Sequence, residues 1–335
     1  MKKFSTIASL LLCAALLFAS CAQQEEPAPS QEAQGYRIGV IQYAAHPSLD
    51  NCYNGFLQGL EEQGIIEGEN LTIEFQNAQG EAANADMQAK NMVTSGCDML
   101  VGIATPAAMS CYSAARETQT PVIFSAVSDP VAAGIVQSME APGSVATGTA
   151  DSLNLEGQMQ MIRAFLPDAK SIGIIYTTSE PNSIAHLEKF EELAPSYGFE
   201  IRAIGVTSAS EVGTAAASLA AEGVDCINNF TDNNVVNNLS LVLHEAEEAG
   251  IPVFGSEEEQ VKNGCLASES LDYVELGKET GRMAAKVLKG EAKPEEMEVL
   301  VIEASAPVYN QAVLEALGLE LPEEYAHAAE VSQGA

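Results

Sequence analysis

Short apolar runs rich in valine and isoleucine alternate along this chain with longer segments of helical periodicity. Arg37–Tyr43 (RIGVIQY) has the length and composition of a strand, and Ser48–Gln63 places its apolar residues on one helical face. Alternating strands and helices predict βαβ units around a parallel sheet, and continuously apolar strands fit a sheet covered on both faces. The alternation continues through Leu71–Phe75, Ala82–Thr94, Asp98–Ala104, Pro106–Glu117 and Pro121–Val127.

The same pattern then occurs a second time in the chain. Ser171–Ile175 (SIGII) echoes Arg37–Ile41 (RIGVI), and Pro252–Ser256 (PVFGS) echoes Pro121–Ser125 (PVIFS), in the same order and at nearly the same offset. A length of 335 residues also suggests about two domains. We therefore predict an α/β fold with two doubly wound parallel-sheet lobes. A ligand cleft is expected between them, at the carboxyl ends of the strands.

The pattern also predicts where each lobe begins and ends. We place lobe 1 at residues 36–150 and lobe 2 at residues 151–271. Residues 272–292 are expected to return to lobe 1 and residues 297–322 to lobe 2, so that the chain crosses between the lobes several times. Residues 323–335 are expected to form a frayed tail. The elements predicted beyond the second repeat are a strand, a helix, a strand and a helix at Cys265–Glu269, Tyr273–Leu288, Glu298–Glu303 and Pro307–Leu317.

The amino terminus has the pattern of a secretory signal. Two lysines precede an apolar run from Phe4 to Ala19, which is too short for a spanning helix, so residues 1–20 are predicted to be a signal peptide. The run ends in LFASC, which resembles a bacterial lipobox in which Cys21 becomes lipidated. Residues 21–35 would then form the lipidated cysteine and a flexible tether on the extracytoplasmic face of the cell membrane. An ordinary signal peptide with a chance cysteine is the alternative.

Charge and motif content exclude several classes of function. The chain has 15 Lys and Arg against 47 Asp and Glu, and a net charge of −32 disfavours nucleic-acid binding. We find no nucleophile elbow, phosphate-binding loop or dinucleotide turn, so we expect no enzyme and no cofactor. The histidines and cysteines show no metal-ligand spacing, so no metal site is expected, and His186 and His244 are expected at the surface. Five cysteines are expected to be buried and free, namely Cys52, Cys97, Cys111, Cys226 and Cys265.

Polar residues gather where the predicted strands end. Hydroxyl groups and helix amino termini suit a carboxylate, carboxylates and amides suit an ammonium group, and tyrosines supply flat apolar faces. Together they predict a cleft for a zwitterion. Helix caps and turns favour the same residue types, so for each single residue a purely structural role stays open. The strand-end segments are Tyr43–Asp50, Thr105–Ala108, Ser125–Pro130, Tyr176–Asn182, Thr231–Asn234 and Ser256–Glu259.

These segments also carry a resemblance to a known family. The runs IGVIQYAAHPSLD, VGIATPAA, FSAVSDPVAAGIV, IGIIYTTSEPNS and FTDNNVV resemble the ABC-transporter substrate-binding lipoproteins that include tryptophan- and tyrosine-binding members. The resemblance implies a type I periplasmic-binding-protein-like fold with three hinge crossings. It also implies delivery of a small ligand to a membrane permease that is powered by a partner ATPase. Asn228–Phe230 departs from the family pattern, in which an apolar residue and a proline more often stand here.

The strand-end residues are then expected to divide the binding of an amino acid among them. Thr105, the backbone N–H of Ala107 and Ser125 are predicted to hold the carboxylate group, whereas Asp232, helped by Asn229, is predicted to hold the ammonium group. For Asp232 a capping role remains open, because a helix is expected to begin directly after it. The remaining candidates frame the ligand's side chain, bind its polar atoms or cap helices, and they are Tyr43, His46, Tyr176, Asn182, Asp129 and Glu257.

The sequence thus predicts a lipid-anchored solute receptor of an ABC importer, with an aromatic amino acid as the first choice of ligand. The lipid is expected to be its only membrane anchor. A sensory or adhesive surface lipoprotein that binds the same ligand without transport is the main alternative. A flavodoxin-like enzyme that uses the cleft is a weaker one, since no nucleophile and base are paired in the sequence.

Overall fold

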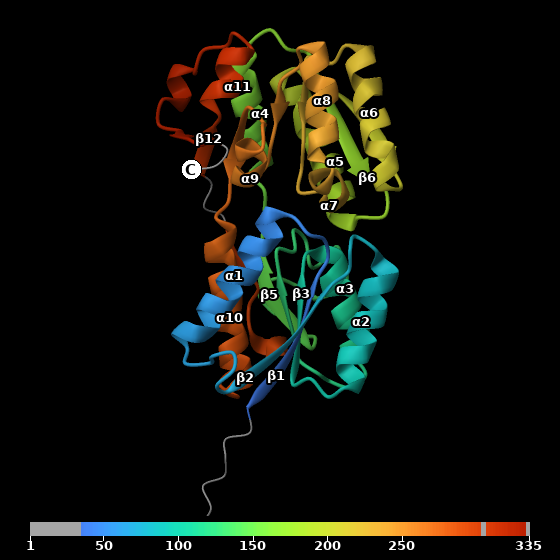
Figure 1. The fold of residues 1–335 in the computed structure, drawn as a ribbon, viewed down its shortest axis with the longest axis vertical. Coiled ribbons are helices and arrows are strands. Elements are labelled where there is room, and N and C mark those ends of the chain that lie inside the picture. The colour runs from blue at the N-terminus through green and yellow to red at the C-terminus, as the bar shows by residue number, and fades with distance from the viewer. Residues whose placement is uncertain (1–34, 303–305, 333–335) are drawn as a thin grey trace, which may run out of the picture. The chain divides into compact units, whose positions relative to one another are not determined.

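The structure is a computed structural model that describes residues 35–302 and 306–332. The predicted signal peptide, Cys21 and nearly all of the predicted tether lie outside the described residues. Residues 35–335 form one compact unit, in which two sheet-and-helix lobes follow each other along the long axis of Figure 1. The fold is the α/β architecture that the alternating pattern predicts.

Lobe 1 is built on a six-stranded parallel sheet of order β11-β5-β4-β3-β1-β2. Helices α1 and α10 pack together on one face of this sheet, and α2 and α3 pack together on the other (Figure 1). The strands are β1 (Tyr36–Gln42), β2 (Leu71–Asn77), β3 (Met99–Ile103), β4 (Val122–Ser125), β5 (Ala146–Ala150) and β11 (Leu300–Val301). The helices are α1 (Pro47–Glu62), α2 (Ala82–Thr94), α3 (Thr105–Ala115) and α10 (Tyr273–Leu288).

Lobe 2 repeats this plan with a shorter sheet. Its four parallel strands have the order β7-β6-β8-β9, and a separate small sheet has the order β10-β12-β13. The strands are β6 (Ser171–Thr177), β7 (Glu200–Val206), β8 (Cys226–Asn228), β9 (Val253–Phe254), β10 (Ala267–Ser270), β12 (Ala306–Tyr309) and β13 (Ala329–Glu330). The helices are α4 (Leu155–Phe165), α5 (Pro181–Leu193), α6 (Ala209–Glu222), α7 (Asn233–Asn237), α8 (Leu239–Ala249), α9 (Glu258–Lys262) and α11 (Gln311–Ala316).

The chain passes between the lobes after β5, after β10 and after β11. The last crossing comes later than the sequence predicts, because Leu300 of β11 still pairs with Thr149 of β5 in the lobe 1 sheet. The predicted helix Pro307–Leu317 is also partly wrong. Its first residues form β12, and α11 begins only after Asn310, whose side chain accepts a hydrogen bond from the backbone N–H of Val313.

The predicted frayed tail is also wrong in its described part. Tyr325 is 8% exposed, and its ring lies 5.8 Å from the ring of Phe165 in α4. Strand β13 then pairs with β12, with Val308 opposite Ala329. Burial of one aromatic ring and one short strand pairing thus hold the segment that begins at residue 323 against lobe 2. The segment has no apolar periodicity that would reveal this in the sequence.

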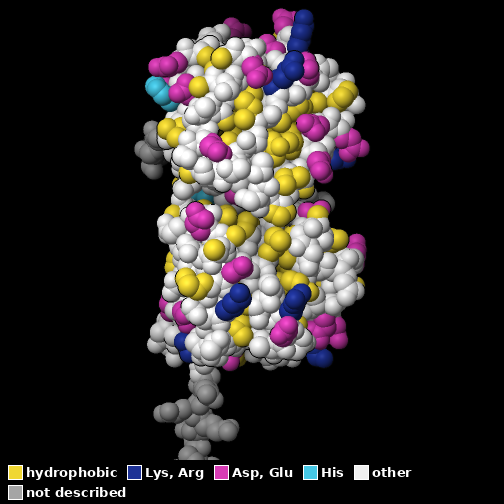
Figure 2. Space-filling view, turned by 90° about the vertical axis from the view of Figure 1, so that its right-hand side faces the viewer, with side chains coloured by type: hydrophobic (Ala, Val, Ile, Leu, Met, Phe, Trp, Pro, Cys, Tyr) yellow, Lys and Arg dark blue, Asp and Glu magenta, His cyan; other side chains and the backbone are white. Residues whose placement is uncertain are grey.

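Carboxylate side chains are frequent on the surface of the described residues. On the face drawn in Figure 2, Asp and Glu side chains are spread over both lobes, with single Lys and Arg side chains among them. No helix within residues 35–302 and 306–332 is long and apolar enough to cross a membrane. The five cysteines of this part of the chain are buried and free, as predicted.

Helices α1 and α10 approach each other so closely that only glycine fits between them. A Cβ atom on Gly55 would lie 2.1 Å from the carbonyl oxygen of Val274, and one on Gly59 would lie 2.1 Å from that of Lys278. Gly277 and Gly281 meet the α1 backbone in the same way. The two helices run parallel, so this contact fixes both of their amino termini at the edge of lobe 1 that faces lobe 2.

This contact predicts a large effect for a small substitution. Gly59→Ala should lower the free energy of unfolding by about 1–3 kcal/mol, because the added methyl group forces the two backbones apart. Gly213→Ala in α6 is the matched control, since a Cβ there would be 3.6 Å from its nearest neighbour, the Leu241 side chain. Alanine at that position should be neutral or stabilise by up to about 1 kcal/mol. Chemical denaturation measures both, and equal stability of Gly59→Ala and the wild type would contradict the account.

Candidate functional site

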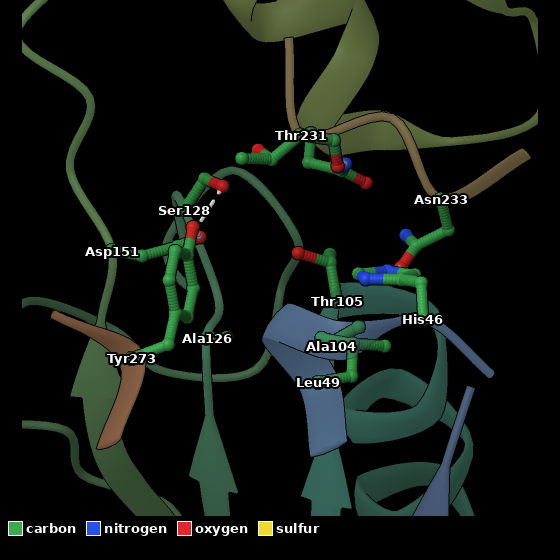
Figure 3. A pocket seen from close by; sticks show the side chains of 11 residues that line it. His46, Leu49, Ala104, Thr105, Ala126, Ser128, Asp151, Thr231, Asn233 and Tyr273 are labelled. Atoms are coloured by element: carbon green, nitrogen blue, oxygen red, sulfur yellow. Dashed lines mark hydrogen bonds between the residues drawn. The ribbon is translucent and has the colours of Figure 1, made fainter. Parts of the chain in front are cut away.

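A pocket lies where the strand-end loops of the two lobes meet (Figure 3). The cavity itself has a volume of about 20 Å³, and about 280 Å³ when the open solvent around it is included. The loops of both lobes contribute to it, which is the arrangement that the strand-end residues predict. The lining residues are His46, Leu49, Ala104, Thr105, Ala126, Ser128, Asp151 and Tyr273 from lobe 1 and the crossings, and Asn182, Thr231 and Asn233 from lobe 2.

Two alanines shape the lobe 1 side of the pocket through strained backbone. Ala104 follows β3 with a φ of 77°, and Ala126 follows β4 with a φ of 54°. Positive φ is unfavourable for any residue with a Cβ, and such strain is found mainly where a site needs a special backbone path. At Ala104 the turn lets α3 begin at Thr105, so that the hydroxyl group of this first helical residue faces the pocket (Figure 3).

Among the described residues that line the pocket, Asp151 is the only one whose side chain carries a formal charge near pH 7. It is 3% exposed, and it stands directly after β5, where the chain leaves lobe 1. Its Oδ1 accepts a hydrogen bond from Ser128 Oγ at 3.1 Å, and its Oδ2 accepts one from the Tyr273 hydroxyl at 3.0 Å. Burial, with a further contribution from the charge of Glu257, raises the pKa of Asp151 to about 6.

The charge of Asp151 has no cationic counterpart among the pocket residues. None of the lining side chains is a lysine or an arginine. His46 is 8% exposed, and burial lowers its pKa to about 4, so its ring is neutral near pH 7. A buried carboxylate is costly unless it is paired or hydrogen-bonded. The pocket is therefore suited to a ligand that brings its own positive charge.

Three further polar atoms in the same pocket have no hydrogen-bond partner. They are His46 Nδ1, Asn182 Oδ1 and Thr231 Oγ1, all of which are buried. Buried polar groups in folded proteins are nearly always partnered, so a group of exceptions in one pocket needs an explanation. Figure 3 shows His46 beside Asn233 on one side of the pocket and the Asp151, Ser128 and Tyr273 side chains on the opposite side.

Asp232 lies outside this pocket, and the structure contradicts its predicted ammonium role. Its Oδ2 accepts hydrogen bonds from the backbone N–H of Thr177 at 2.6 Å and from Ser183 Oγ at 2.6 Å. Its Oδ1 accepts from Thr177 Oγ1 at 2.8 Å and from the backbone N–H groups of Asn234 and Val235 at 3.1 and 2.9 Å. Five donors leave this fully buried carboxylate no lone pair for a ligand. Asp232 is the cap of α7, the alternative that the sequence left open.

Of the other predicted residues, the structure brings His46, Thr105 and Asn182 to the pocket. Ser125 does not line the pocket. Its side chain is fully buried in lobe 1, where its Oγ accepts a hydrogen bond from Thr280. Ala107 is buried within α3 and does not line the pocket.

Neither predicted tyrosine frames the pocket. The Tyr43 hydroxyl donates to the carbonyl oxygen of Gly80 at 2.8 Å, and the Tyr176 ring lies over Gly205 in the edge strand β7.

Three more predicted residues lie outside the pocket, and two of them have structural partners. Asn229 donates to Gln260 Oε1 at 3.1 Å. Asp129 accepts from the backbone N–H groups of Val131 and Ala132 in a turn. Glu257 is buried just before α9 and lines a separate depression beside α8.

His186 is likewise buried, contrary to the prediction that it lies at the surface. It is 7% exposed, and its ring packs 5.5 Å from that of Phe230. His244 is exposed as predicted, and its Nε2 lies 3.7 Å from Glu248.

Sequence reasoning missed Asp151 and Tyr273, and it named the segment Ser125–Pro130 without giving Ser128 a role. Asp151 ends its strand as the chosen residues do, so the strand-end rule could have found it. Tyr273 begins α10, and only the chain's return to lobe 1 brings it to the pocket. Among the described residues, no cluster of three or more His, Cys, Asp or Glu side chains is arranged to hold a metal ion.

Comparison with known proteins places this geometry in a family. A family model for the ABC transporter substrate binding protein matches residues 37–332. The chain belongs to this family. A "Tyrosine-binding protein" of Clostridioides difficile (strain R20291) is 33% identical over 329 residues, which is 96% of this chain and 94% of that protein.

Solved structures of related substrate-binding proteins share the fold. A Streptococcus pneumonia protein in complex with L-Trp has a TM-score of 0.85 at 34% identity, covering 89% of this chain and 99% of its own. A ligand-free, open substrate-binding protein with adhesive properties from Clostridium difficile has a TM-score of 0.67 at 35% identity, covering 89% and 100%. The architecture is the type I periplasmic-binding-protein-like fold, as predicted.

The hydrogen bonds of Asp232 predict that its loss acts on stability. Asp232→Asn should lower the free energy of unfolding by about 1–3 kcal/mol, because the amide nitrogen cannot accept from the donors that surround it. Asp272→Asn is the matched control. Asp272 caps α10 with two backbone N–H donors and is exposed, so an asparagine should cap equally well there. A denaturation midpoint of Asp232→Asn equal to that of the control would contradict this assignment.

Proposed function

We propose that this substrate-binding protein captures an α-amino acid in the pocket between its lobes, with an aromatic side chain preferred. We further propose that it delivers this ligand to the permease of an ABC importer, which a partner ATPase powers. The observation that carries the ligand assignment is Asp151, a buried carboxylate that lines the pocket with no cationic side chain beside it. A ligand ammonium group would supply the missing charge.

The polar groups around Asp151 fit the rest of a zwitterion. An ammonium group has three N–H donors, and the oxygens of Thr231 and Asn182 offer unpartnered acceptors from lobe 2. On the lobe 1 side, the Thr105 hydroxyl stands at the start of the 11-residue helix α3. Unpaired N–H groups and the positive end of a helix dipole suit a carboxylate. Binding across both lobes would thus favour their closure.

Two observations support an aromatic side chain. Leu49, Ala104 and Ala126 give the pocket apolar surface, and the ring of Tyr273 adds to it on the side of Asp151. One relative is named a tyrosine-binding protein, and a related structure holds L-Trp. An adhesive or sensory role at the cell surface is a second candidate, which the adhesive properties of one related structure favour. Both roles would use the same pocket.

The ligand proposal is tested by calorimetric titration with L-tyrosine at two pH values. We expect binding at about pH 7.5 and at least tenfold weaker binding at about pH 5, because protonation below the pKa of about 6 removes the charge of Asp151. L-Tryptophan should also bind, whereas glucose should not. Failure of every amino acid to bind, together with binding of a sugar, would overturn the proposal.

The variant Asp151→Asn separates binding from folding. Because burial raises the pKa of Asp151, its charge opposes folding, and stability should fall as pH rises from about 4 to 6. The variant should therefore unfold without ligand at or above the wild-type temperature. It should also bind L-tyrosine at least about tenfold more weakly, with little change between the two pH values. Asp129→Asn, in a turn outside the pocket, is the control.

The lipid anchor and the extracytoplasmic location are proposals that rest on the lipobox-like sequence before Cys21. Cys21→Ala should release the protein from the membrane fraction, because the lipid is the only anchor that the sequence offers. Cys13→Ala lies within the predicted signal peptide and should leave the protein membrane-bound. Retention of Cys21→Ala on membranes after a high-salt wash would refute the anchor.

A further inference from the structure

Three hydrogen-bonded side chains connect the two lobes beside the pocket. They are Glu180 and Asn233 of lobe 2 and His46 of lobe 1. We propose that Glu180, acting through Asn233, leaves Nδ1 of His46 as a bare acceptor for a hydrogen-bond donor in the ligand's side chain. The pocket would then select tyrosine, which has an O–H donor, and tryptophan, which has an N–H donor, over phenylalanine, which has neither. This inference rests on the proposed function, in which the ligand is an amino acid, and it adds that the ligand's side chain carries a hydrogen-bond donor.

The first of the three side chains is Glu180, which is 1% exposed and directly precedes α5. Its Oε2 accepts hydrogen bonds from the backbone N–H of Asn233 at 3.1 Å and from the Asn233 side chain at 2.7 Å. A backbone N–H can only donate, so Oε2 acts as an acceptor here. Burial and the charge of Asp232 raise the pKa of Glu180. A proton on this carboxyl group belongs on Oε1, because Oε2 has the closer backbone donor. The Asn233 atom that faces Oε2 is then the amide nitrogen, and the amide oxygen of Asn233 points away from Glu180.

That amide oxygen determines the state of His46. Asn233 Oδ1 lies 3.4 Å from His46 Nε2, and an amide oxygen can only accept. Nε2 must carry the proton, and in a neutral imidazole the other nitrogen is then bare. Burial keeps the pKa of His46 at about 4, so the ring stays neutral over the physiological range.

The bare nitrogen is placed to meet a ligand side chain. Nδ1 of His46 is buried, has no hydrogen-bond partner, and belongs to a residue that lines the pocket. Figure 3 shows His46 on the side of the pocket opposite Asp151, the expected ammonium partner. A ligand with its ammonium group at Asp151 would extend its side chain toward His46 and Leu49. Its terminal donor would satisfy an atom that is otherwise left unpaired, and phenylalanine would leave that atom unpaired.

The first test compares three ligands on the whole mature protein by calorimetric titration. L-Tyrosine and L-tryptophan should each bind at least about tenfold more tightly than L-phenylalanine, the difference expected for one buried hydrogen bond. In His46→Leu, tyrosine and tryptophan should lose this advantage while phenylalanine binds as before. Equal affinities for all three ligands in the wild type would overturn the inference.

The variant Glu180→Leu tests the positioning role. Leucine cannot accept from Asn233, which frees the amide to turn its nitrogen toward His46 and moves the ring proton to Nδ1. Tryptophan, a donor only, should then bind about tenfold more weakly. Tyrosine should lose less, because its hydroxyl can also accept, and phenylalanine should not change. Glutamine must turn its oxygen to the backbone N–H of Asn233, so Glu180→Gln should keep the wild-type preference. Glu192→Gln, exposed on the same helix, is the control and should leave all three affinities unchanged.

A spectroscopic measurement makes the outcome independent of affinity. Nitrogen-15 NMR of histidine-labelled protein should show His46 protonated at Nε2 and bare at Nδ1 in the wild type, and protonated at Nδ1 in Glu180→Leu. A proton on Nδ1 in the wild type, or no change in the variant, would refute the relay even if amino acids bind. If no amino acid binds, the proposed function fails, and with it the ligand assignment at His46, whatever the spectra show.

Discussion

The close contact between α1 and α10 is the constraint on which the pocket depends. Four glycines let the two parallel helices touch backbone to backbone, since any Cβ at Gly55 or Gly59 would overlap a carbonyl group of α10. His46 and Leu49 stand at the amino-terminal end of α1, and Tyr273 begins α10. One helix contact therefore fixes, on opposite sides of the pocket, side chains that are far apart in sequence.

The interior of the pocket is polar, and a polar ligand would satisfy its unpartnered groups. Asp151 is held by two hydroxyl groups but meets no cation, and three other buried atoms have no partner at all. Each unmade buried hydrogen bond costs about 1–3 kcal/mol, so a ligand that satisfies several at once gains that energy on binding. Because these groups come from both lobes, the same energy favours a closed pair of lobes.

The sequence predicts the fold well and the site only in outline. Valine- and isoleucine-rich runs and their repetition predict two parallel-sheet lobes, since such long-period patterns follow directly from burial of both sheet faces. The pocket loops are also predicted, because parallel strands end at one edge. Short pairings such as β11, which has two residues, and the packing of Tyr325 depend on tertiary contacts that leave no local pattern.

Individual residues at the strand ends could not be assigned from sequence, as the two aspartates illustrate. Both aspartates are buried. Asp151 comes directly after β5, and Asp232 comes shortly after β8. The lone pairs of Asp232 are used by Thr177 and Ser183, which are 55 and 49 residues away in sequence. Only the fold shows that these donors surround one aspartate and not the other. The same residue type therefore caps a helix in one lobe and faces the pocket at the lobe crossing.

A crystal structure of the protein with L-tyrosine bound is the most direct test of this account. We expect density for the amino acid between the lobes, with the ammonium nitrogen of the ligand within hydrogen-bond distance of the Asp151 carboxylate. A ligand bound with its carboxylate group against Asp151, or seated at Asp232 or outside the pocket, would contradict it.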